Sequence, residues 1–88
     1  MENEMDTDTL LMRGIAERLL TQHRVPLESV TWHMQGDSLV MSFPWGGSQK
    51  TFAFARMVIL LVARYDDPDT VANVERALAD LLAGRIEK

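Results

Sequence analysis

The chain has 88 residues, of which 47% are hydrophobic and 25% are charged, with no cysteine and a formal net charge of -4. This composition fits one globular domain with a modest core, and it excludes a disulfide framework and a thiolate metal site. Four of the 13 acids lie in the first eight positions, so the remainder is balanced at nine acids and nine bases and lacks the positive field of a nucleic-acid binder.

The acidic start of the chain lacks the apolar segment of a secretory signal. We therefore expect a disordered acidic leader over residues 1–5, a single domain over residues 6–88 and a cytoplasmic location. A first helix is expected to begin near Asp6–Asp8, whose side chains suit a helix start, and to stop before Pro26. Gly14 inside this helix costs about 1 kcal/mol relative to alanine and suggests that another backbone approaches closely. The expected apolar stripe of the helix consists of Leu11, Met12, Ile15, Leu19 and Leu20.

Residues 30–35 and 38–43 alternate between apolar and polar side chains, which predicts two half-buried strands. The intervening pair Gly36-Asp37 is typical of a two-residue hairpin turn. A second turn over residues 44–48 leads into a third predicted strand.

Residues 51–65 are the most apolar stretch of the chain, and Arg56 is the only charge between Phe52 and Ala63. The run is shorter than the roughly 20 apolar residues of a membrane-spanning helix. It can form a buried helix, a buried strand, or a strand followed by a helix. The alternation at its start favours a strand at 49–54 and a helix at 55–66. One continuous helix would remove the third strand.

The last helix has the clearest boundaries, because Asp67 is a suitable N-cap, Pro68 fits the first helical position and Gly84 is a natural C-cap. Its apolar stripe consists of Val71, Val74, Leu78, Leu81 and Leu82. The predicted fold is α+β in the order α-β-β-β-α-α, with helices packed on one face of a three-stranded antiparallel sheet.

Residues 46–51 are similar to a phosphate-binding loop only in part, because Gln49 stands where that motif requires glycine before the lysine. A glycine-rich hairpin turn explains the same residues. His23 and His33 have no metal-ligand spacing and no evident partner for general base catalysis. The aspartates at 66, 67 and 69 lack the glycine and terminal glutamate of a calcium loop. We therefore expect no enzyme activity, no cofactor and no metal.

Trp45 lies in the predicted second turn, where an aromatic side chain can anchor a protein interface or fold back over the sheet edge. With the catalytic motifs missing, we expect a small protein-binding module that occupies a partner's surface as an inhibitor, adaptor, chaperone or accessory subunit, of the kind encoded by bacteria and phages. Apolar surface in excess of one small core also predicts a homodimer. The candidate partner-binding residues are Trp45, Pro44, Lys50 and Arg56. The alternative is a nucleic-acid-associated regulator that uses the first-helix arginines Arg13, Arg18 and Arg24.

Overall fold

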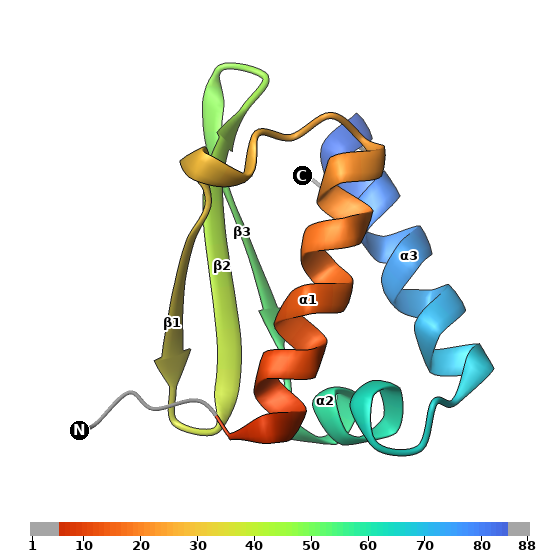
Figure 1. Cartoon of the computed structure of the whole chain (residues 1–88). Coiled ribbons are helices and arrows are strands. Elements are labelled where there is room, and N and C mark those ends of the chain that lie inside the picture. Colours follow the sequence, from red (N-terminus) through yellow and green to blue (C-terminus); the bar gives the residue numbers. More distant parts are fainter. Residues whose placement is uncertain (1–5, 85–88) are drawn as a thin grey trace.

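The computed structural model describes residues 6–84 and shows the predicted order of elements, with one turn of 3₁₀ helix added after the first helix (Figure 1). The elements are α1 (Thr7–Gln22), η1 (Leu27–Ser29), β1 (Thr31–Gln35), β2 (Ser38–Trp45), β3 (Ser48–Phe54), α2 (Arg56–Ala63) and α3 (Pro68–Ala83). The expected leader over residues 1–5 and the last four residues of the expected domain lie outside the described part of the chain.

The three strands form one antiparallel sheet in the order β1-β2-β3, so β2 is central and β1 and β3 are its edges. All three helices lie on the same side of this sheet (Figure 1). The predicted α+β architecture, with helices on one face, is therefore confirmed. No described helix is both long and apolar enough to cross a membrane.

Both hairpins close through two-residue turns, because Gln35 pairs with Ser38 and Trp45 pairs with Ser48. In the second turn Gly46 and Gly47 have φ angles of 61° and 85°, which are both left-handed. Glycine adopts this conformation without steric cost. The backbone twist of a turn with two left-handed residues matches the twist of the flanking strands. The glycine-rich segment is thus a hairpin turn.

α1 begins as expected, because the Asp6 carboxylate accepts a hydrogen bond from the Thr9 amide at 2.9 Å. The helix ends at Gln22, before the proline, because Arg24 adopts a left-handed φ of 66°. The Val25 amide then donates back to the Leu20 carbonyl at 3.0 Å, and both of these side chains are buried. This is the Schellman ending of a helix, with arginine at the position that glycine usually takes.

The core lies between the helices and the inner face of the sheet. Its strand residues include Leu39, Met41, Phe43 and Phe54, and its helix residues include Met12, Ala16, Leu20, Ile59, Val62, Val74 and Leu78. The assignment of Leu11 to the apolar stripe was wrong, since its side chain is 50% exposed. Thr9 is buried on the inner side of α1 instead, because it lies three residues before Met12 on the same helix face.

The central apolar stretch divides into a strand and a helix, as the sequence favours. β3 ends at Phe54 and α2 begins at Arg56, but α2 stops at Ala63, three residues earlier than expected. Asp66 then takes a left-handed φ of 51° and turns the chain toward α3. The predicted boundaries of α3 are confirmed, with Asp67 as N-cap and Gly84 as a left-handed C-cap.

Candidate functional site

An apolar groove lies between the edge strand β3 and the two C-terminal helices, with a volume of about 370 Å³. We call it the β3–α3 groove. Its lining comprises Phe52, Ala53 and Phe54 from β3, Val58 and Leu61 from α2, and Thr70, Asn73, Val74 and Ala77 from α3. Most of these side chains are apolar, and the two polar ones are uncharged. A concave apolar surface of this kind is where a small protein usually receives a ligand or a partner.

α3 runs antiparallel to β3 along the groove. The end of β3 is connected to the start of α3, and the hairpin that precedes β3 is bonded to the end of α3. At one end α2 links the last residue of β3 to the first turn of α3 (Figure 1). At the other end the indole Nε1 of Trp45 donates a hydrogen bond to the Leu82 carbonyl at 2.9 Å. The groove therefore follows the length of the edge strand.

The backbone of β3 has a free side that adjoins the groove. In a two-residue hairpin the residues that flank the turn exchange hydrogen bonds, and every second pair does so thereafter. With Trp45 opposite Ser48, the peptide groups of Gln49, Thr51 and Ala53 point away from β2. No other described strand pairs with this side of β3. Three residues thus present N–H and C=O groups to an incoming chain.

Apolar side chains also lie exposed on α2, beside the groove. Met57 is 65% exposed, and Leu61, which lies four residues later on the same helix face, lines the groove. Tyr65, two residues after the end of α2, is 66% exposed. The apolar lining of the groove therefore continues onto the outer side of α2.

Trp45 folds back toward the helices. It lies two residues beyond Phe43 on β2, so its side chain is on the covered face of the sheet, where it packs half-buried against the core. The indole nitrogen of Trp45 is used by its bond to the Leu82 carbonyl. This carbonyl is in the last turn of α3, where helix carbonyls have no partner within the helix. The structure therefore gives Trp45 a role in joining the hairpin to α3.

The four candidate partner-binding residues do not form one surface. Pro44, Trp45 and Lys50 lie at the hairpin end of the sheet, but Pro44 is on the open face, whereas Lys50 and Trp45 are on the helix-covered face. Arg56 lies at the opposite end of β3, at the start of α2. The role of these residues in binding stays a prediction.

Pro44 is tolerated in the central strand because β1 does not reach it. Its nitrogen faces the β1 side, and the first residue of β1, Thr31, pairs with Ser42. A proline at this point therefore removes no hydrogen bond from the sheet.

Arg56 is engaged by the start of α1. Its guanidinium donates to Asp6 Oδ2 at 2.6 Å and to Thr9 Oγ1 at 3.2 Å. The bond from Arg56 and the bonds from Thr9 hold the pKa of Asp6 well below its ordinary value of 3.8. A second pair, Arg64 with Asp8 at 2.6 Å, joins the same two helices. Together these contacts fasten α1 to α2.

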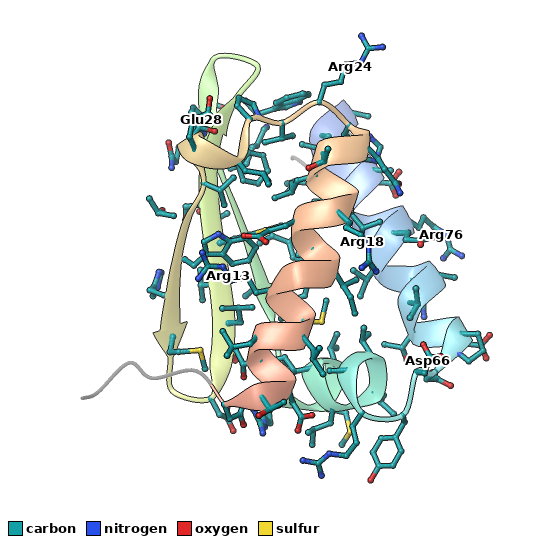
Figure 2. All side chains as sticks on the ribbon, in the orientation of Figure 1. Arg13, Arg18, Arg24, Glu28, Asp66 and Arg76 are labelled. Atoms are coloured by element: carbon teal, nitrogen blue, oxygen red, sulfur yellow. The ribbon has the colours of Figure 1, made fainter. Side chains whose placement is uncertain are left out.

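The arginines of the nucleic-acid alternative diverge. Arg13 forms an ion pair with Glu17 at 3.3 Å and lies 5.2 Å from the ring centre of Trp32. Figure 2 shows Arg13 toward the sheet, Arg18 on the side of α1 that faces α3, and Arg24 pointing away beyond the helix end. This arrangement offers no continuous basic surface, and the alternative stays a prediction.

Within residues 6–84, no three histidine or acidic side chains are grouped so as to hold a metal ion. His23 caps the end of α1, and His33 lies on the open face of the sheet, opposite Val40. In the described part of the chain, every buried side-chain nitrogen and oxygen has a hydrogen-bond partner. The polar core therefore offers no unpaired group that would point to a bound ligand.

No protein-family model, curated protein or solved structure matches the chain. The groove was not predicted from the sequence, although the alternation at Phe52 and Phe54 and the stripe through Val74 indicated the strand and the helix that form it. The one sequence signal for exposed apolar surface beside the groove was Met57, because this apolar residue follows the charged Arg56 at the predicted start of a helix. Which strand would be an edge depended on tertiary pairing.

Proposed function

We propose that the chain is a non-enzymatic protein-binding module that receives an extended segment of a partner protein along the free edge of β3. The observation that carries this proposal is the position of an apolar groove directly beside an unpaired strand edge. Addition of a peptide strand to a sheet edge is a common mode of recognition, in which backbone bonds give affinity and side-chain pockets give specificity.

Backbone groups and groove supply complementary parts of the binding energy. Gln49, Thr51 and Ala53 offer outward N–H and C=O groups, so an added strand can continue the sheet by one strand. Every second side chain of that strand would point to the helix-covered side of the sheet, where Phe52 and Ala77 line the groove. Burial of apolar side chains there would contribute about 25 cal/mol per Å².

One charged residue of β3 limits which chains can pair with its free edge. Lys50 is on β3 with its side chain on the helix-covered side, and an inward-pointing charge on an edge strand disfavours unspecific pairing. A partner must therefore accommodate Lys50 as well as fill the groove. An inhibitor, adaptor, chaperone or accessory subunit can act through such a surface, and so can a second copy of the chain in a homodimer.

The test is selection of binders from a random peptide library, followed by affinity measurement with three proteins. Ala77→Glu places a carboxylate on the groove wall, and Ala72→Glu makes the same change on the exposed side of α3. We expect selected peptides with apolar residues at alternate positions, which lose at least tenfold in affinity with Ala77→Glu and bind Ala72→Glu like the wild type. A tenfold loss corresponds to about 1.4 kcal/mol.

A second variant tests the backbone of the edge. The Thr51 amide points away from β2, so Thr51→Pro removes an outward donor without removing a backbone hydrogen bond of the sheet. It also removes the exposed side-chain bond between Thr51 and Ser42 at 3.3 Å. We expect this variant to remain folded by circular dichroism and to lose peptide binding. Selected peptides that bind both Ala77→Glu and Thr51→Pro with wild-type affinity would refute the proposal, as would a selection that enriches no peptide. Analytical ultracentrifugation of the wild type would show whether a second copy occupies the edge.

A further inference from the structure

Among the described residues, the charged side chains that are not used in an ion pair have opposite signs at the two ends of the β3–α3 groove. Arg56 and Arg64, at the end where α2 follows β3, are paired with Asp6 and Asp8 of α1. At the end where β3 finishes and α3 begins lie Asp66 and Asp69, which are both exposed. The carboxylate of neither residue forms a hydrogen bond or an ion pair within residues 6–84. Asp67, between them, is occupied as the N-cap of α3 through the Thr70 amide at 3.1 Å. This end of the groove therefore has two carboxylates available to a partner.

Basic side chains lie farther along the groove, toward the hairpin. Arg76 donates to Asn73, a groove residue, at 3.3 Å. Lys50 lies on β3 two residues before Phe52, on the same side of the strand. The acidic residue Asp80 of α3 also lies in this region, and its side chain already takes part in another interaction. Figure 2 shows Asp66 at the turn between α2 and α3 and Arg76 on the body of α3.

The geometry points to a bound segment that runs antiparallel to β3 and is basic at its amino-terminal end and acidic at its carboxyl-terminal end, with apolar side chains at alternate positions between them. This inference rests on the proposed function. An antiparallel strand places its amino-terminal end at the end of the groove that Phe54 and Thr70 line, toward Asp69 beside Thr70 and Asp66 at the turn before α3, and its carboxyl-terminal end beside Lys50. All strand pairs of the sheet are antiparallel, and antiparallel pairing is slightly more stable per residue.

The contribution of charge is modest for each pair but depends on orientation. A single exposed ion pair contributes little to affinity. A peptide whose end charges are opposite to those of the groove is nevertheless favoured in one direction, because a peptide with its charged ends exchanged would bring like charges together at both ends. We expect a peptide that is basic at its amino-terminal end and acidic at its carboxyl-terminal end to bind about five- to tenfold more tightly at low salt than the peptide with these ends exchanged. The exchange replaces an attraction by a repulsion at each end of the groove. The difference should nearly vanish at 1 M salt, where the screening length is about 3 Å.

The experiment uses two synthetic peptides of the same composition. One has two lysines, then alternating valine and threonine, then two glutamates, and the other has the lysine and glutamate pairs exchanged. Titration calorimetry with the full chain at low and high salt gives the affinity ratio. Asp66→Asn/Asp69→Asn should abolish most of the preference, because asparagine tolerates the left-handed φ of position 66 while removing the charge. Glu75→Gln, an exposed change on α3 outside the groove lining, should leave the preference intact.

The outcomes separate this inference from the proposed function. Equal affinities for the two peptides, or a preference that survives Asp66→Asn/Asp69→Asn, would overturn the charge-directed orientation. If those peptides still lose affinity with Ala77→Glu, binding in the groove stands and only the orientation fails. A preference for the reversed peptide would assign a parallel strand and also overturn the inference.

Discussion

Replacement of Trp45 by phenylalanine tests how the second hairpin is joined to α3. The change keeps an aromatic ring on the covered face of the sheet but removes the bond from Nε1 to the Leu82 carbonyl at 2.9 Å. A hydrogen bond of this kind contributes about 1 kcal/mol net. In a domain of this size, that loss lowers the melting temperature by about 4–8 °C. The last turn of α3 should fray first, because its carbonyl loses a partner.

Urea unfolding followed by circular dichroism measures the loss of stability, and amide hydrogen exchange locates it in α3. Trp32→Phe is the matched control, because Trp32 is also half-buried against the core but its indole nitrogen has no hydrogen bond among the described residues. The control should leave exchange in the last turn of α3 unchanged. Wild-type stability and wild-type protection of residues 80–83 in Trp45→Phe would refute the reasoning. Trp45 would then be free to act as the exposed interface anchor that the sequence also allows.

Two further predictions concern α1. The close backbone approach that the sequence suggested at Gly14 is wrong, because an added Cβ meets no atom within 4 Å. Gly14→Ala should therefore raise the free energy of unfolding by about 1 kcal/mol, since alanine favours the helix. Urea unfolding checks this, with Ala72→Gly as the reverse change, and a loss of stability in Gly14→Ala would contradict the open space at this position. The depressed pKa of Asp6 stabilises the fold above its unfolded value of 3.8, and this contribution is lost as the pH falls through 3.8 toward the folded pKa. Asp6→Asn should therefore have a lower free energy of unfolding than the wild type at pH 7. Unfolding curves measured at decreasing pH should show the two free energies converging below pH 3.8. A difference between the two proteins that does not change with pH would contradict the pairing of Asp6 with Arg56.

Most of the secondary structure could be predicted because its causes are local. The N-cap at Asp67 and the glycine at position 84 define α3 within its own sequence. The turn at Gly36-Asp37 follows from residue type in the same way. The error at Leu11 has a different origin: apolar spacing identifies an amphipathic helix, but its exact orientation is set by the surfaces against which it packs.

The candidate site shows the limit of sequence reasoning more clearly. Exposed apolar surface for a partner was expected, but it was assigned to Trp45 at the hairpin. The structure instead shows Trp45 bonded to Leu82, 37 positions away, and Arg56 bonded to Asp6, 50 positions away. Neither pairing leaves a pattern in a single sequence, because the partners are brought together only by the packing of helices on the sheet.

The sequence alone determined the order of elements and the division of its most apolar stretch into a strand and a helix. These features depend on side-chain period, caps and turn residues within a few positions of each other. Tertiary structure decided which strand has a free edge, where the β3–α3 groove opens and which charges stand at its ends. These features depend on the relative placement of β3, α2 and α3, which follows from the burial of one shared core.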